Sequence, residues 1–165
     1  MKKLLLLITT FLATYNLANA QAPLENGKLQ LNAGLGTSGW GTPIYVGLDY
    51  GLGNNITLGS EISYRSYDSY GFKMSILGIQ GNANYHFNEV LEIPSQWDLY
   101  AGLSLNYYNW NFKDDYAEQV VDDTHFGIGI QIGGRYFFTD NFAINLEGGG
   151  GNATSGGKIG ITYKF

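Results

Sequence analysis

The chain of 165 residues has no cysteine and a net charge of −5, and 15 % of its residues are aromatic whereas only 14 % are charged. The missing cysteines exclude disulfides and thiolate metal sites, and the excess of acids argues against nucleic-acid binding because no basic stripe could neutralise phosphates. The length favours one domain, and 24 glycines with 13 tyrosines indicate many short strands and turns.

The first residues have the pattern of a secretory signal peptide. Met1-Lys2-Lys3 is followed by an apolar run, and Ala18-Asn19-Ala20 has the small-x-small spacing of a cleavage site. The alternative is an inner-membrane anchor, but the apolar run is well short of the roughly 20 residues that a spanning helix needs. The expected parts are a cleaved signal peptide, a short lead and one folded domain, at residues 1–20, 21–27 and 28–165.

Eight later segments alternate apolar and polar side chains with a period of two, which is the period of a β-strand. They cover residues 28–36, 44–50, 55–66, 73–87, 97–109, 125–138, 142–147 and 157–165. The connections expected between them are 37–43, 51–54, 67–72, 88–96, 110–123, 139–141 and the glycine-rich 149–156. Longer loops alternate with mostly shorter turns, which is typical of outer-membrane barrels; only the turn at 88–96 departs from this by its length.

The two faces of these strands differ in character. One face is apolar and carries aromatic rings near its ends, such as Tyr50, Trp97 and Phe138, while the other is polar or glycine. A soluble lipocalin would turn the apolar face inward, but so many rings would clog its cavity, and eight strands leave an interior about filled by side chains. We therefore predict an all-β fold: an eight-stranded antiparallel up-and-down transmembrane β-barrel with its apolar face towards lipid.

The last strand carries the most specific pattern, Ile161-Thr162-Tyr163-Lys164-Phe165, which alternates and stops on an aromatic residue. Together with the signal peptide and the eight segments, it resembles the small outer-membrane barrels of the OmpA/OmpX-like kind. The stretch 85–108 also resembles the small porin-like barrel proteins of Bacteroidetes. The resemblance implies a place in the outer membrane of a Gram-negative cell and recognition by the barrel-assembly machinery and periplasmic chaperones. The implied assembly signal is Ile161, Tyr163 and Phe165.

Charged residues on the polar face form the first candidate site. They are Glu61, Arg65, Arg135, Glu147 and Lys158. These residues could line a gated polar pathway, but we favour a salt-bridged plug, because charges removed from water must be paired and the lumen of eight strands is narrow. Lys158 has Glu61 and Glu147 as its possible partners.

A second cluster of carboxylates crowds the fifth loop, and its members are Asp114, Asp115, Glu118, Asp122 and Asp123. Their oxygens could bind Ca²⁺ or Mg²⁺ and bridge to lipopolysaccharide phosphates. The spacing matches no EF-hand, so a solvated acidic loop is the preferred interpretation. We accordingly predict no resident metal and no cofactor.

Catalysis in a lipid-modifying barrel would depend on His86 or His125, the only histidines of the chain. Nucleophilic catalysis needs a hydroxyl beside the imidazole, and neither histidine has a serine nearby on its own strand face. We therefore predict no catalytic residues.

The expected function is a structural or surface-interaction role, such as membrane integrity, adhesion or ligand binding through the outer loops. Trp40, Tyr67, Tyr70 and Trp110 fall in these loops and could form a binding rim or simply the upper aromatic girdle. A narrow porin-like channel for ions or small solutes is the alternative, and a lipid-modifying enzyme is third. We expect a monomer whose partners are outer-membrane lipid and lipopolysaccharide.

Overall fold

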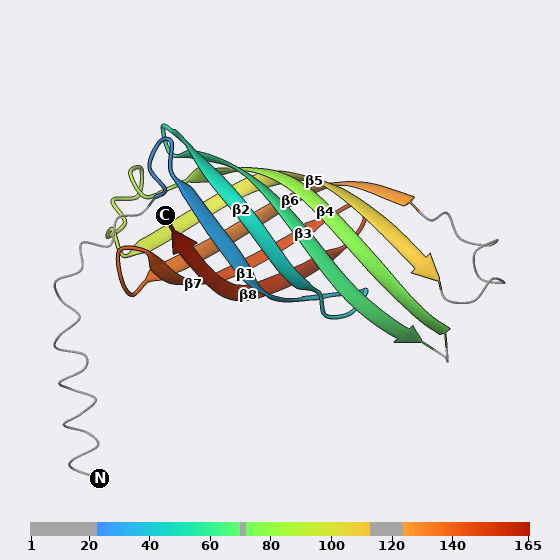
Figure 1. Cartoon of the computed structure of the whole chain (residues 1–165). Coiled ribbons are helices and arrows are strands. Elements are labelled where there is room, and N and C mark those ends of the chain that lie inside the picture. Colours follow the sequence, from blue (N-terminus) through green and yellow to red (C-terminus); the bar gives the residue numbers. More distant parts are fainter. Residues whose placement is uncertain (1–22, 70–71, 113–123) are drawn as a thin grey trace, which may run out of the picture.

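The computed structural model describes residues 23–69, 72–112 and 124–165 of the chain, and they form a closed barrel (Figure 1). Each strand pairs antiparallel with the next, and the last pairs with the first. The strands are β1 (Leu29–Ser38), β2 (Ile44–Gly53), β3 (Ile56–Ser69), β4 (Phe72–His86), β5 (Trp97–Phe112), β6 (Thr124–Phe137), β7 (Phe142–Gly151) and β8 (Ser155–Lys164). This confirms the eight-stranded antiparallel up-and-down barrel. No helix among the described residues is long and apolar enough to cross a membrane.

The register of the strands keeps their alternation in phase around the barrel. Leu31 of β1, for example, lies opposite Leu48 on one side and Tyr163 on the other. Paired residues share a face, and a slip by one position would move a whole strand's apolar set to the wrong side. The apolar pattern of the sequence therefore specifies the register.

The first described residues and the C-terminus lie at one end of the barrel, here called the terminal end, and the opposite end is called the loop end (Figure 1). The terminal end holds the short β2–β3 turn, in which Gly53, Asn54 and Asn55 have φ angles of 81°, 52° and 60°. Glycine and asparagine tolerate this left-handed region best. The same end holds the long β4–β5 connection, as the sequence predicted.

Several strands are longer than their side-chain pattern indicates. The expected loop at 67–72 was wrong, because β3 and β4 stay paired up to Ser69 and Phe72. Likewise, the predicted start of the loop at 110–123 is too early in the sequence, because Trp110 is still paired with Ile76. Backbone groups hydrogen-bond whatever the side chains are, so pairing continues where the alternation has faded.

The glycine-rich segment at 149–156 is also largely strand. In β7, Gly149 lies opposite Gly156 of β8, and Gly150 lies opposite Ser155. Only residues 152–154 lie between the two strands. Glycine has no side chain, so a run of glycines shows no alternation of apolar and polar residues even where its backbone pairs as a normal strand.

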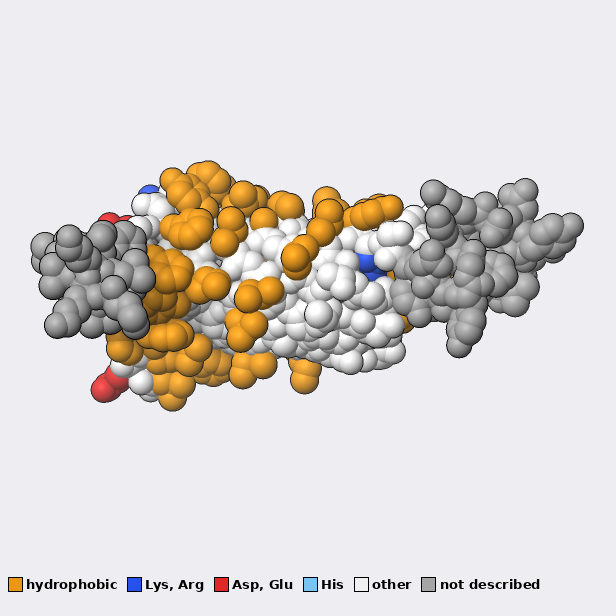
Figure 2. Space-filling model, turned by 90° about the horizontal axis from the view of Figure 1, so that it is seen from below, with side chains coloured by type: hydrophobic (Ala, Val, Ile, Leu, Met, Phe, Trp, Pro, Cys, Tyr) orange, Lys and Arg blue, Asp and Glu red, His pale blue; other side chains and the backbone are white. Residues whose placement is uncertain are grey.

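The apolar face points outward, as predicted for a lipid-facing band. Leu103 and Leu105 of β5 are 63 % and 68 % exposed, and Ile130 of β6 is 67 % exposed. On the face shown in Figure 2, hydrophobic side chains crowd the terminal half, while polar or bare backbone surface lies towards the loop end. A soluble barrel would place such residues inside, so the exposure indicates lipid as the surrounding medium.

The short lead before β1 folds across the terminal end. Leu24 is 6 % exposed, and the N–H of Gly27 donates to the carbonyl of Gly51 over 2.9 Å. The lead is therefore packed against the barrel although its composition is mostly polar. Residues 1–20 lie outside the described residues, so the signal peptide and the divisions at 20 and 27 stay predictions.

The outward apolar face can be tested with one charge. We expect Leu103→Arg, near the middle of β5, to lower the free energy of unfolding in lipid bilayers by about 2–4 kcal/mol, because the guanidinium would enter hydrocarbon. Leu91→Arg is the matched control: Leu91 is 60 % exposed in the β4–β5 connection, outside the strands. Denaturant titrations would measure both, and equal stability of the two variants would contradict a lipid-facing band.

Candidate functional site

The predicted lumen charges form two ion-pair clusters instead of one network. In the first, Lys158 of β8 reaches across the lumen to Glu61 of β3, with an Nζ–Oε1 distance of 2.8 Å, and contacts its direct neighbour Glu147 of β7 over 3.1 Å. Tyr100 donates its hydroxyl hydrogen to the second oxygen of Glu147 over 2.9 Å. The predicted pairing of Lys158 with both glutamates agrees with this geometry, and it ties three strands together.

The second cluster is centred on Arg135 of β6, which is 3 % exposed. Its Nη1 donates to Asp98 over 2.8 Å and its Nη2 donates to Asp49 over 2.9 Å. Gln30 and Asn32 also donate to Asp49, over 2.8 and 2.9 Å. The two aspartates face inward as the strand pattern indicates, but they were absent from the predicted network. Asp98 lies directly opposite Arg135 in the β5–β6 pair, whereas Asp49 of β2 meets Arg135 only across the lumen.

His86 lies in the same cluster, and here sequence reasoning missed a contact. Its Nδ1 lies 2.6 Å from Asp98 Oδ1, and its Nε2 lies 3.0 Å from Thr57 Oγ1. A hydroxyl, an imidazole and a carboxylate thus stand in the order of a hydrolytic triad. The contact is found only by pairing inward residues of β3, β4 and β5. All three side chains are at most 1 % exposed, so the arrangement is sealed from solvent.

Arg65 does not join either ion-pair cluster, although it points inward as predicted. Its Nη1 donates to the hydroxyl of Ser38 over 2.7 Å. Its guanidinium carbon lies 5.9 Å from the ring centre of Trp40 and 5.7 Å from that of Tyr108. The cation is therefore held by a hydroxyl and two ring faces near the loop end.

The tryptophans assigned to the outer loops are part of this arrangement. Trp40 packs edge-on against Tyr108 and Trp110, with ring centres 5.1 and 5.0 Å apart. Because Tyr108 points into the lumen, these rings gather over Arg65 and do not form a separate rim. Tyr70 lies outside the described residues, as does the side chain of Tyr67.

The terminal half of the lumen is filled. Arg135, His86 and Asp98 occupy it together with the ring of Phe137, and none of the four is more than 3 % exposed. Further towards the loop end, the hydroxyl of Tyr45 donates to Asn145 over 2.8 Å. Two layers of ion pairs and rings therefore cross the lumen, and a smaller space lies between them. The plug stays a prediction.

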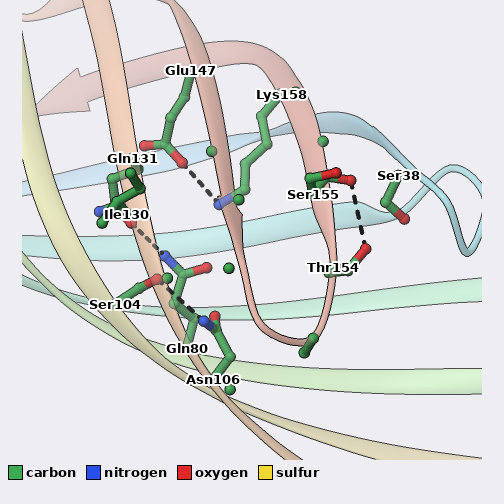
Figure 3. Close-up of a pocket in the computed structure, with 18 of the residues that line it drawn as sticks. Ser38, Gln80, Ser104, Asn106, Ile130, Gln131, Glu147, Thr154, Ser155 and Lys158 are labelled. Carbon is green, nitrogen blue, oxygen red and sulfur yellow. Dashed lines mark hydrogen bonds and ion pairs between the residues drawn. The ribbon is translucent and has the colours of Figure 1, made fainter.

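The loop half of the lumen holds a cavity, here called the loop-end cavity (Figure 3). It encloses about 610 Å³ of space, part of it open to solvent, and Lys158 and Glu147 form part of its lining. Amide and hydroxyl side chains line it, among them Gln80, Ser104, Asn106 and Gln131. The part of it that water can reach is about 90 Å³, well below the roughly 300–1,000 Å³ of ordinary ligand sites, so it has the size and polarity to hold a few water molecules.

Two other predicted sites differ in what can be said of them. The acidic residues of the fifth loop, Asp114 to Asp123, lie outside the described residues, and the described residues contain no group of three or more potential metal ligands. The residues of the predicted assembly signal lie on β8 and at the final position: Ile161, Tyr163 and Phe165 all face outward, and the N–H of Phe165 donates to the carbonyl of Leu29 over 3.0 Å. These residues thus belong to the strand that closes the barrel, and their role in assembly stays a prediction.

The buried arginine should be essential to stability. We expect Arg135→Met to cost about 3–5 kcal/mol of unfolding free energy, because it leaves Asp49 and Asp98 charged and unpaired in a dry lumen. Adding Asp49→Asn and Asp98→Asn to it should restore part of the loss. Lys28→Met, at an exposed cation, is the control. Denaturant unfolding in bilayers measures all three, and an Arg135→Met protein as stable as the control would refute the pairing.

Comparison with known proteins agrees with this geometry. Solved structures with the same fold include the outer membrane protein OprG from Pseudomonas aeruginosa, which is 13 % identical with a TM-score of 0.67 over 86 % of this chain and 97 % of that one. The N-terminal β-barrel domain of OprF from the same organism is 19 % identical with a TM-score of 0.57, over 85 % and 98 %. Ail, the attachment invasion locus protein of Yersinia pestis, is 14 % identical with a TM-score of 0.52, over 85 % and 99 %.

Identities this low establish a shared fold and nothing further. No curated protein sequence matches the chain, and the resemblance to barrels of Bacteroidetes stays a prediction. A family model described as the outer membrane protein beta-barrel domain matches residues 4–165. Because that match covers nearly the whole chain, the protein belongs to the outer-membrane β-barrel domain family and is a protein of the outer membrane.

Proposed function

We propose that the protein is a closed outer-membrane barrel whose role is structural or lies in surface interaction at its loop end. The observation that carries this proposal is the filled terminal half of the lumen, where Arg135 bridges Asp49 and Asp98. Short turns and chain ends face the periplasm in such barrels. A plug there leaves the loop end, which faces outward, as the accessible part of the interior.

Biogenesis and partners follow from the same architecture. The exposed apolar band would contact outer-membrane lipid, and the outer rim would contact lipopolysaccharide. Ile161, Tyr163 and Phe165, on the closing strand, are suited to recognition by the barrel-assembly machinery after delivery by periplasmic chaperones. With all strand edges paired within one chain, a monomer needs no partner to complete its sheet.

A narrow channel is the second candidate, favoured by the polar lining of the loop-end cavity. Lys158 borders that cavity, however, and the rings of Tyr45 and Tyr100 line a second space further in, next to Arg135. Tyr100 also lies under the guanidinium of Arg135, 4.3 Å from ring centre to carbon. An ion crossing the barrel would have to part these groups, which is why a closed barrel is the preferred function.

Planar bilayers distinguish the two candidates. We expect no steady conductance from the wild-type protein, and new conductance from Tyr45→Ala/Tyr100→Ala, which removes the two rings at mid-lumen. The matched control is Tyr64→Ala/Tyr85→Ala, since both of these tyrosines are exposed on the outer face. Steady open channels in the wild type would overturn the closed-barrel function.

Among the described side chains, Thr57, His86 and Asp98 are the set that an enzymatic role would use. The side chain of His125 lies outside them. We propose that this buried set is structural, because Thr57 is 1 % exposed and Asp98 already holds Arg135. We expect His86→Gln to lower the unfolding free energy, and we expect mass spectra of lipid A to be the same from cells with and without the wild-type protein. A protein-dependent mass change that disappears in Thr57→Val would instead establish a lipid-modifying enzyme.

A further inference from the structure

A hollow on the outer surface of the barrel plays no part in the function proposed above. It lies over β5, β6 and β7, and almost all of its lining is apolar. About 640 Å³ of it can be reached by a molecule the size of water, compared with about 90 Å³ in the loop-end cavity. It therefore falls within the roughly 300–1,000 Å³ of ordinary ligand sites. We call it the outer groove, and its outward lining residues are Trp97, Leu99, Gly134, Tyr136, Ile144, Leu146 and Ile159.

The outer groove exists because a glycine interrupts a row of large apolar side chains. Gly134 of β6 lies opposite Leu99 of β5 and Leu146 of β7, and residues that lie opposite one another share a face of the sheet. Beyond Leu146 the same row continues with Ile159 of β8 and Leu35 of β1. A Cβ added to Gly134 would lie 3.0 Å from Leu99 Cδ2. Any side chain at this position would therefore fill the groove from its floor.

The walls of the groove run along the strands. Trp97 and Leu99 form the wall on β5, and Ile144 and Leu146 form the wall on β7. Trp97 is the first residue of β5 and packs against Tyr136 of β6, with ring centres 4.7 Å apart. Tryptophan and tyrosine rings of membrane proteins lie at the level of the lipid headgroups. The groove therefore leads from the headgroup level at the terminal end into the hydrocarbon.

The membrane itself has to fill this groove. Water does not fill an apolar hollow, because nothing there offers it hydrogen bonds, and the exposed apolar band around the groove indicates lipid as the medium. Apolar surfaces within a membrane associate through close van der Waals packing. A hydrocarbon chain on the flat part of the band is packed on one side, whereas a chain in the groove is packed against a floor and two walls. The groove therefore holds a chain more tightly than its surroundings do.

The same walls are unfavourable for a second copy of the barrel. Leu99 and Leu146 stand on either side of the floor at Gly134 and are 39 % and 65 % exposed. The convex wall of another barrel would rest on these two side chains and leave the floor empty. A flexible hydrocarbon chain can enter between them. The occupant that fits the groove is therefore linear and apolar.

From these observations we infer that the outer groove binds an acyl chain of a phospholipid from the periplasmic leaflet. The terminal end faces the periplasm in such barrels, so the headgroup would lie beside Trp97 and Tyr136. The indole N–H and the phenolic O–H can donate to its ester and phosphate oxygens. The chain would lie over Gly134, between the two walls. The inference depends on this orientation and not on whether the lumen is closed.

Fluorescence of Trp97 can report the bound chain. The sequence has three tryptophans, and Trp40 and Trp110 lie near the loop end beside Arg65, so a Trp40→Phe/Trp110→Phe protein retains Trp97 alone. In dodecyl maltoside micelles, phosphatidylethanolamine with a dibrominated acyl chain should quench its emission saturably, and unbrominated phosphatidylethanolamine should reverse the quenching. Quenching that only follows the mole fraction of brominated lipid in the micelle would overturn the inference.

Substitutions of two outward glycines assign the site. We expect Gly134→Leu to weaken the binding of brominated phosphatidylethanolamine at least about tenfold, because the new side chain occupies the floor of the groove. Gly81→Leu is the matched control, since a Cβ at Gly81 on β4 meets nothing within 4 Å, and it should leave binding unchanged. If Gly134→Leu does not fold, as judged by heat-modifiable gel migration, Ile159→Ala replaces it and should weaken binding by removing part of the lining. Unchanged affinity in the variant that folds would overturn the inference.

Native mass spectrometry identifies the occupant without altering the tryptophans. The wild-type protein, released from outer membranes in detergent, should retain one phospholipid, and the groove variant that folds should lose it. Equal retention of lipid by both proteins would refute the inference. A dimer that the groove variant converts to a monomer would assign the groove to a second copy and refute it as well. Steady conductance in planar bilayers would instead refute only the proposed function.

Discussion

Pairing of β8 with β1 is the constraint on which the rest of the structure depends. Lipid offers no hydrogen bonds to a backbone, so an open sheet edge within the membrane would leave a row of unsatisfied N–H and C=O groups. The register from Gln30 opposite Lys164 to Ser38 opposite Gly156 removes that edge. Closure also separates an inside from an outside, so that alternate residues of every strand must suit lipid and the others must suit a narrow polar lumen.

The lumen then imposes its own requirement, because charges placed there are removed from water. Buried charges must therefore be paired. Lys158 and Arg135 each bind two carboxylates, and every such pair joins different strands. These pairs cross the terminal half and the middle of the barrel. Arg65 is held instead by Ser38 and two aromatic rings, and the loop-end cavity lies beside it.

Glycine connects the wall of the barrel with this cavity. Gly149 and Gly156 are paired strand residues, although their stretch of sequence looks like a loop. Because they lack side chains, they leave both surfaces of the β7–β8 wall bare near the loop end. The lack of side chains that hides these strand ends in the sequence therefore also leaves space for the loop-end cavity.

The sequence by itself determined the strands, which face of each strand meets lipid, and the pairing of Lys158. A period of two is a local property of the sequence, and lipid favours the same apolar face on every strand. The sequence could not supply the ends of β3 and β4, where pairing depends on a neighbour, nor the strand character of Gly149. Only the tertiary structure decided that Asp49 also holds Arg135, because β2 and β6 meet across the lumen only once the barrel has closed.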